Sequence, residues 1–379
     1  MDLAAQRRVA AAMRETITAG RLRRAGVIAE SLPWDRPRRW RDHLRTVPDR
    51  SAVAALVLAD EPTDLTRRLF GGPPRLQLSG SGFWRYELPG ELSGSALLTE
   101  PSAIAPYAAE VRRRCRADGL AYLELRGSPS KYRPHDPVGW LMDFKTALGP
   151  DRGCLIRFVV IGDRRRPRSV EVAARTAVAA RRQLGSWIAG LDIAGAELRR
   201  PGHMAQLLSP VFRDCLPVTI HAGEGRPAAW IWEAAYRLHA DRIGHGLSLA
   251  DSPDLAHRFR DRRICLELCP TSNREVVGYY DPAVPESAGL PAYPLRSLLD
   301  LGVPLTLCTD NPGISRTTLA DEYLAAGRMS KLTWWEALAL IKQGFLHAFC
   351  PATERDRLLV EADRRISTII AEDFPWPQP

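Results

Sequence analysis

Short apolar runs alternate with longer helical patterns along most of the chain after about residue 119. The runs lie at 120–126, 154–162, 187–195, 217–223, 242–246, 264–270 and 303–310. Between them lie segments such as 169–184 and 228–240, whose apolar residues recur at helical spacing. Unbroken apolar strands that alternate with helices indicate a parallel sheet covered by helices.

Seven such units favour an α/β fold, a TIM-type (β/α)8 barrel with its first strand unrecognised and, on one interpretation, absent. A doubly wound open sheet is the alternative. No G-x-G-x-x-G motif follows the first run, which argues against a dinucleotide-binding version of that fold.

The N-terminal part follows a different pattern. Segments 3–18 and 51–59 have helical spacing. The Pro-rich stretch 31–43 separates them, and a Gly/Pro-rich connector at 70–82 ends the region. We therefore expect a mostly helical region over residues 1–90 and a barrel domain over residues 91–379.

The composition narrows the classes of function. The net charge of the 379-residue chain is +9, but its basic residues are nearly all arginines scattered among acids, which argues against a nucleic-acid binder. The longest wholly apolar run, Ala52–Ala59, is too short to span a bilayer, and no secretion signal is visible. The seven cysteines form no C-x-x-C pair, so we expect reduced thiols, no thiolate zinc site and a cytoplasmic location.

Side chains that suit catalysis stand at the ends of three of the last four runs. His221 and Glu224 end one run, His245 ends the next, and Asp310 with Asn311 ends the last. In a parallel barrel these ends open on one face, so the side chains converge. Imidazole and carboxylate suit a divalent metal such as zinc, and a metal-activated water also needs a proton donor.

Each of these residues also has an ordinary structural interpretation. A histidine at a strand end is more often structural than a ligand, and Glu224 could be a first-turn acid favoured by the helix dipole. Asp310 and Asn311 before a proline could form a simple turn. The joint pattern favours chemistry, because independent accidents would not all fall at neighbouring strand ends.

Four motifs resemble, in this order, those of the adenosine deaminase family. They are HAGE at 221–224, RIGHG at 242–246, CPTSN at 269–273 and TDNP at 309–312. Three further stretches are similar to the family, namely YLELRGSP at 122–129, GLDIAGAE at 190–197 and the tail at 341–359. The resemblance covers roughly residues 95–365, and the ordered series carries it rather than any single motif.

The resemblance implies a role for each candidate. His221 and Asp310 would bind one zinc ion, and Asp310 would also help to deprotonate the bound water. Glu224 would protonate the purine N1, His245 would hold the attacking hydroxide, and Gly195 would offer its amide to the N3 edge. The implied reaction is hydrolytic loss of the 6-amino group from adenosine or a related 6-aminopurine nucleoside or nucleotide, with release of ammonia.

The sequence departs from the family at two points. Asn311 stands where the family has an aspartate that donates to the purine N7, and an amide NH₂ can donate the same hydrogen bond. The family's first strand ends in His-x-His, which supplies two further ligands, and no H-x-H occurs anywhere in this sequence.

Three interpretations of the missing ligands remain open. A protein partner could supply the H-x-H strand, since residues 94–111 resemble the segment that precedes the second strand in large members of the family. His135, in the loop after the first run, could replace one ligand. Alternatively, the chain is a degenerate scaffold that keeps the barrel and acts as an interaction protein.

Overall fold

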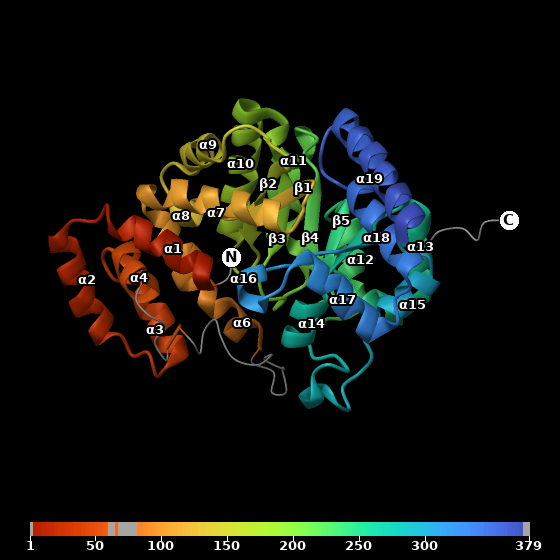
Figure 1. Cartoon of the computed structure of the whole chain (residues 1–379), viewed down its shortest axis with the longest axis horizontal. Helices are drawn as coiled ribbons and strands as arrows, with labels where there is room; N and C mark the ends of the chain where they lie inside the picture. The colour runs from red at the N-terminus through yellow and green to blue at the C-terminus, as the bar shows by residue number, and fades with distance from the viewer. Residues whose placement is uncertain (1–2, 60–64, 67–81, 374–379) are drawn as a thin grey trace.

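The structure is a computed structural model that describes residues 3–59, 65–66 and 82–373 (Figure 1). Seven strands form one parallel sheet in which sequence order is also spatial order. They are β1 (Tyr122–Gly127), β2 (Leu155–Asp163), β3 (Ile188–Ala194), β4 (Val218–Ala222), β5 (Arg242–His245), β6 (Cys265–Leu268) and β7 (Leu305–Leu307). Each strand coincides with one of the seven predicted runs, and only β1 and β2 extend past theirs, by one residue each, so this part of the prediction is confirmed.

The sheet is curled but not closed. Within the described residues β1 pairs only with β2 and β7 pairs only with β6, so the two edge strands are not joined to each other. All six pairings are parallel, which places the carboxyl ends of the strands at one edge of the sheet. The predicted TIM-type α/β fold, with its first strand missing from the recognised set, is confirmed.

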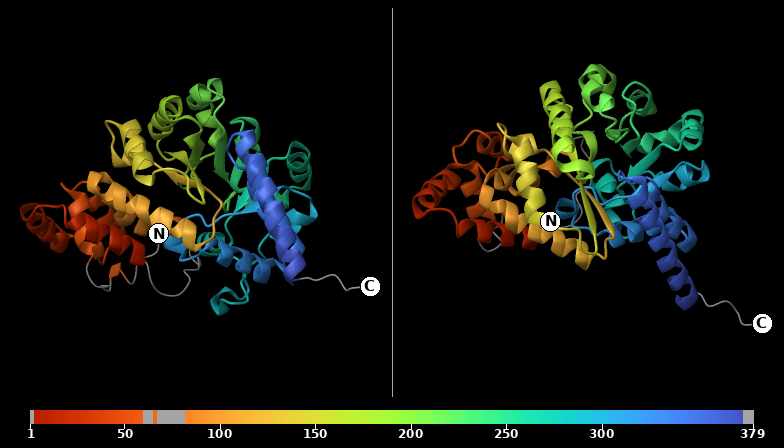
Figure 2. Two further views of the ribbon diagram at one scale, coloured as in Figure 1. Left: turned by 45° about the horizontal axis from the view of Figure 1, so that its top comes forward. Right: turned by 90° about the horizontal axis from the view of Figure 1, so that it is seen from above.

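Helices follow the strands and cover the outer face of the sheet (Figure 2). Those of the barrel are α7 (Ile104–Ala117), α8 (Pro129–Tyr132), α9 (Pro137–Leu148), α10 (Pro167–Leu184), α11 (Ser209–Arg213), α12 (Ala228–Tyr236), α13 (Pro253–Arg262), α14 (Pro270–Val276), α15 (Leu295–Asp300), α16 (Pro312–Ser315), α17 (Leu319–Ser330), α18 (Trp334–Leu346) and α19 (Ala352–Asp373). Helices α10 and α12 confirm the helical patterns predicted at 169–184 and 228–240, although α12 ends earlier than the pattern. His239 has a positive φ of 51°, which marks the turn after that helix.

The described part of the N-terminal region is helical, as predicted. Its helices are α1 (Leu3–Arg14), α2 (Ala19–Ser31), α3 (Pro37–Leu44), α4 (Arg50–Ala59) and α6 (Gly82–Gly90), followed by a short π-helix, η1 (Glu91–Ala96). The prediction missed α2, and it took the 31–43 stretch as an interruption, although Pro37 there opens α3. A proline at the first helical position lacks only an N–H that would have no partner in the helix, so it is compatible with a helix start. Most of the connector predicted at 70–82 lies outside the described residues.

Ion pairs tie the N-terminal helices to the barrel. Arg8 of α1 donates to Glu110 of α7 through two nitrogens, at 2.6 and 2.9 Å. Arg45, directly after α3, pairs with Glu91 of η1. Helices α1–α4 lie on one side of the molecule and α19 on the other in both figures. The division at residue 90 stays a prediction.

Helix α6 connects the N-terminal region to the strand ends, because it contacts both α14 and α16. Helix α14 begins shortly after β6 ends, and α16 begins shortly after β7 ends, so both helices lie at the carboxyl ends of these strands. Among the described residues, no helix is both long and apolar enough to cross a membrane.

Candidate active site

The predicted catalytic residues come together at the carboxyl ends of β4, β5 and β7. His221 lies in β4 and His245 is the last residue of β5, and the centroids of their rings are 5.0 Å apart. Glu224 follows β4, and its Oε2 lies 3.6 Å from His245 Nε2. The backbone at His245 and Asp310 has positive φ values of 64° and 51°, and such conformations in residues other than glycine concentrate at functional sites.

The Glu224 carboxyl is suited to carry a proton at neutral pH. Its side chain is only 8% exposed. Burial and the nearby negative charge of Asp310 raise its pKa to about 8. Both effects act in the same direction because each disfavours the charged form. Glu224 can therefore donate a proton to a bound ligand at pH 7.

His245 is held as a neutral imidazole. Burial and the neighbouring His221 lower the pKa of His245 well below its ordinary value. The Asn273 amide nitrogen lies 2.9 Å from His245 Nδ1. The amide oxygen of Asn273 accepts from the backbone N–H of Cys269 at 3.1 Å and from the Tyr293 hydroxyl at 2.9 Å, which fixes the orientation of the amide. Asn273 therefore donates to Nδ1, and the single ring proton of His245 is on Nε2, facing Glu224.

His221 is oriented by a buried carboxylate. Its Nδ1 lies 3.0 Å from Oδ1 of Asp192 on β3, whose side chain is fully buried. Burial lowers the pKa of His221, but the charge of Asp192 and this hydrogen bond outweigh it, so the pKa is raised. Among the described residues Nε2 of His221 makes no hydrogen bond, so it is left for a ligand. A carboxylate behind a histidine is the usual arrangement for a metal-binding imidazole.

Three donors surround the Asp310 carboxylate. Oδ2 accepts from the Ser272 hydroxyl at 2.7 Å and from the Tyr86 hydroxyl at 3.2 Å. Oδ1 accepts from the Asn311 amide at 3.1 Å. The buried Tyr86 comes from α6, and its oxygen also lies 2.9 Å from Ser315 Oγ, so a residue from outside the seven strand–helix units reaches the site.

The two predicted substrate-binding residues lie at the same strand ends. Asn311 is exposed and precedes α16, where its amide is engaged with Asp310. Gly195 follows β3 with φ +99°, and a Cβ there would stand 2.8 Å from an oxygen of Asp163. Only glycine fits that position without strain. Their roles toward a purine stay predictions.

Glu197 holds the turn that carries Glu224. Its two carboxylate oxygens accept from the backbone N–H groups of Gly223, at 3.1 Å, and Glu224, at 2.9 Å. The buried Arg164 donates to the carbonyl oxygens of Ile193 and His221, which ties the ends of β3 and β4 together. These contacts fix the backbone beneath the catalytic side chains before any ligand binds.

Charged side chains also fill the barrel interior beneath His221. Arg126 of β1 pairs with Asp192, at 3.1 Å, and with Glu267 of β6. Arg242 of β5 has its Nε 2.9 Å from Glu267 and also pairs with Glu124 of β1. Burial raises the pKa of Glu267, but the charges of Arg126 and Arg242 outweigh it and hold that pKa well below its ordinary value. An ion-pair network thus runs from the floor of the barrel to the carboxylate that orients His221.

Several of these residues were not assigned from the sequence. Asp192 and Glu197 lie in the GLDIAGAE stretch, and Ser272 and Asn273 lie in CPTSN, so their position in motifs at strand ends was the available signal. Nothing in the sequence around Tyr86 indicates its contact with Asp310, which depends on the packing of α6 over the strand ends.

The metal ligands are incomplete among the described residues. His221 and Asp310 offer an imidazole nitrogen and a carboxylate, and catalytic zinc usually has three protein ligands and a water. Within residues 3–59, 65–66 and 82–373, no group of three or more His, Cys, Asp or Glu side chains is placed to hold a metal ion. His135 is exposed in the turn before α9 and does not complete such a group. These residues alone therefore do not fit a catalytic zinc ion.

Comparisons with known proteins identify the same family that the ordered motifs resemble. The sequence model of the family described as adenosine deaminase matches residues 88–365. An adenosine deaminase of Shewanella loihica is 30% identical over 273 residues, covering 69% of this chain and 78% of that protein. An adenosine deaminase of Pseudoalteromonas translucida is 29% identical over 280 residues, covering 72% of this chain and 80% of that protein.

Solved structures share the fold. An amidohydrolase from Burkholderia ambifaria with bound zinc is 21% identical, with a TM-score of 0.69 over 87% of this chain and 90% of that one. Arabidopsis ADAL in complex with IMP is 23% identical, with a TM-score of 0.60 over 76% of this chain and 83% of that one. Because the family's sequence model spans more than half of the chain and the motifs converge at one barrel face, the chain belongs to the adenosine deaminase family.

Proposed function

We propose that the chain acts by hydrolytic deamination on an adenine-containing nucleoside or nucleotide, removing the 6-amino group as ammonia. Family membership makes it a deaminase-type hydrolase and supports purine deamination as its chemistry. The observation that carries the proposal is the pairing of a Glu224 carboxyl, whose pKa is raised to about 8, with a neutral His245 at one barrel face. A structural neighbour in complex with IMP supports a nucleotide as one form of the substrate.

Different side chains act on the purine N1, on the oxygen that attacks C6, and on the N7 and N3 positions of the ring. The proton on Glu224 passes to N1, which draws electrons from C6 and opens it to attack. His245 donates a hydrogen bond from Nε2–H to the oxygen that attacks C6, since Asn273 already occupies Nδ1. Of the two protons of the water, one would pass through Asp310 to the amino nitrogen, which leaves as ammonia, and the other would return to Glu224 as the C6=O bond forms. Asn311 donates to N7 and the amide of Gly195 to N3, which fixes the orientation of the ring.

The experiment measures ammonia release from adenosine, adenine and AMP by the wild type and by Glu224→Gln, with zinc and the H-x-H partner polypeptide inferred below present. A glutamine amide cannot deliver the N1 proton, so we expect turnover to fall by about 10²–10⁴-fold. Glu30→Gln is the matched control, because Glu30 is exposed on α2 in the N-terminal region and belongs to none of the strand-end motifs. Turnover of Glu224→Gln close to that of the control would remove Glu224 from the mechanism.

The family and the zinc-bound neighbour imply a metal cofactor. His221 and Asp310 are the residues of this chain that would hold it, and a bound zinc ion would activate the attacking water. We infer that the remaining ligands come from an H-x-H strand on a further polypeptide, which would pair with the open edges of β1 and β7. An unpaired strand edge presents free N–H and C=O groups to such a strand.

Zinc titration by calorimetry tests this inference. The purified chain should bind zinc weakly, and binding should tighten when a product of a neighbouring gene with an H-x-H strand is added. Sub-micromolar zinc affinity and full turnover by the chain alone would contradict the need for a partner. Absence of zinc binding and of ammonia release in both arrangements would instead favour the degenerate scaffold.

A further inference from the structure

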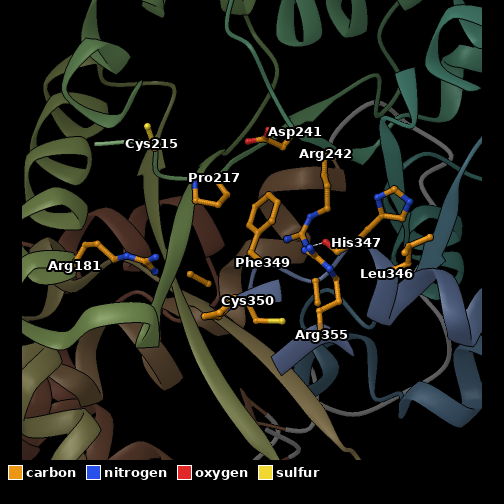
Figure 3. A pocket seen from close by; sticks show the side chains of 13 residues that line it. Arg181, Cys215, Pro217, Asp241, Arg242, Leu346, His347, Phe349, Cys350 and Arg355 are labelled. Carbon is orange, nitrogen blue, oxygen red and sulfur yellow. Dashed lines mark hydrogen bonds between the residues drawn. The ribbon is translucent and has the colours of Figure 1, made fainter. Parts of the chain in front are cut away.

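A pocket of about 340 Å³ lies at the end of the barrel opposite to the catalytic strand ends (Figure 3). Its wall includes Ala189 near the start of β3, Pro217 just before β4, and Arg242 at the start of β5. The end of α10 and the segment 346–351, between α18 and α19, complete the wall. The volume falls within the range of about 300–1,000 Å³ that is typical of small-molecule sites.

The wall carries more positive than negative charge. Three arginines line it, Arg181, Arg242 and Arg355, against one carboxylate, Asp241. Asp241 accepts the backbone N–H of Val218 at 2.8 Å, so part of its hydrogen-bonding capacity is used within the chain. Figure 3 shows the side chains of Arg242 and Arg355 both directed into the pocket.

The charges of two of the three arginines are not neutralised by an ion pair with a described residue. In the part of the chain that the structure describes, the guanidinium of Arg355 makes no hydrogen bond or ion pair, and Arg181 reaches only the carbonyl oxygen of Ile188. Glu354, the acid next to Arg355 in the sequence, pairs with Arg157 at 2.7 Å instead. Charges without a partner in a concave site attract a ligand of opposite sign.

The third arginine forms a rigid back wall. Arg242 is compensated by Glu124 and Glu267, and its guanidinium lies 3.5 Å from the centroid of the Phe349 ring. Its Nη1 donates to the carbonyl oxygen of His347 at 2.7 Å, which fixes the segment between α18 and α19. The ring of Phe349 adds an apolar surface beside the charges.

The pKa of His347 reflects the positive charge of the arginines around it. Burial, together with the charges of Arg242, Arg263 and Arg355, lowers the pKa of His347 to about 4. The imidazole is therefore neutral at pH 7, and it can donate a hydrogen bond to an anion without adding to the repulsion between the arginines.

The N-terminus of α19 adds a further attraction for anions. This 22-residue helix begins at Ala352, directly after Cys350 and Pro351, which both line the pocket. The backbone N–H groups of Glu354 and Arg355 already donate to the carbonyl oxygen of Pro351, each at 3.0 Å, but the helix dipole favours negative charge at this end. Arg355 projects from the first turn of the same helix.

We propose that this pocket binds a small molecule that carries one or two phosphate groups. Arg355 and Arg181 supply the charge, the dipole of α19 adds to it, and His347 supplies a further donor. Phosphate suits this set because several oxygens can be shared between separate donors. Phe349 and Pro217 leave an apolar wall for an organic group. The site shares no residue with the catalytic face and does not depend on the proposed deamination.

Isothermal titration calorimetry at low salt tests the proposal with inorganic phosphate, pyrophosphate and phenyl phosphate. Tighter binding of pyrophosphate would indicate a diphosphate ligand, and tighter binding of phenyl phosphate would indicate an organic monoester. We expect Arg355→Gln to weaken binding of the best probe by about tenfold or more, as for loss of one charge-assisted contact. Arg357→Gln is the matched control, because Arg357 is exposed on the same helix and does not line the pocket.

Arg181→Gln provides a second variant on a separate helix, and the unfolding temperature of each variant checks that it is folded. Weakened binding in both variants, with Arg357→Gln unchanged, supports the site. Equal affinity in Arg355→Gln, Arg181→Gln and wild type would overturn it, because the anion would then bind elsewhere. Failure of all three probes to bind the wild type would overturn it as well.

Discussion

Replacement of Arg126 by glutamine should destabilise the fold more than any change to a surface ion pair. Arg126 reaches Asp192 at 3.1 Å and also pairs with Glu267, and the side chains of both acids are at most 4% exposed. Glutamine leaves two buried carboxylates facing each other without this cation. Removal of one partner of a buried ion pair costs about 3–5 kcal/mol, a large part of the roughly 5–15 kcal/mol that holds a typical domain together.

The loss should also depend on pH. In the wild type Glu267 has a lowered pKa, which contributes stability above the unfolded-state pKa and loses it as the pH falls through the folded-state pKa. Without Arg126 the carboxylates are less stabilised in their charged form, so their folded-state pKa values rise. The difference between wild type and variant should therefore grow as the pH rises through the ordinary range of carboxyl pKa values, from about 3 to about 7, and level off above it.

Urea unfolding followed by circular dichroism measures both effects, at about pH 3 and about pH 7, below and above the ordinary pKa values of Asp and Glu. Arg365→Gln is the control, since Arg365 is 60% exposed and its pair with Glu361 lies on the surface of α19. Exposed pairs contribute little to stability, so the control should unfold like the wild type. A loss of less than about 1 kcal/mol for Arg126→Gln, or a loss that is the same at both pH values, would refute the reasoning.

Three further predictions concern the catalytic face. If Glu224 must be protonated, kcat should fall as the pH rises through about 8, and a flat profile up to pH values well above its pKa would contradict that role. Asn273→Leu removes the donor that fixes the ring proton of His245 on Nε2. This change should cost about 1–3 kcal/mol of transition-state stabilisation and lower kcat more than it changes KM. An unchanged kcat would show that the tautomer of His245 does not matter. A 7-deaza analogue of adenosine should bind more weakly by about 1–3 kcal/mol if Asn311 donates to N7, and equal affinity would remove Asn311 from the binding residues.

The barrel could be predicted from the sequence because its strands carry a simple pattern. β2 and β3 are buried along almost their whole length, so their sequences are mainly apolar runs, and segments with helical spacing separate such runs along the chain. His221, His245 and Asp310 could be placed together for the same reason, since parallel strands bring their carboxyl ends to one face.

Other features depend on tertiary packing, which the local pattern does not encode. The contact between Tyr86 and Asp310 joins residues far apart in the sequence and requires α6 to lie across the strand ends. The network of Arg126, Arg242 and Glu267 places charges inside the barrel, where sequence reasoning expects apolar layers. Helix α2 was missed because an Arg-rich segment has only a weak apolar stripe.

Ammonia release from adenosine and AMP, followed while zinc is titrated into the chain with and without an H-x-H partner, tests the central claim most directly. We expect turnover that requires zinc, that is far greater with the partner, and that Glu224→Gln abolishes. Full turnover by the chain alone at sub-micromolar zinc would contradict the inferred incompleteness of the metal site. Zinc bound tightly in the completed assembly, with no ammonia released from any purine, would contradict the proposed deamination itself.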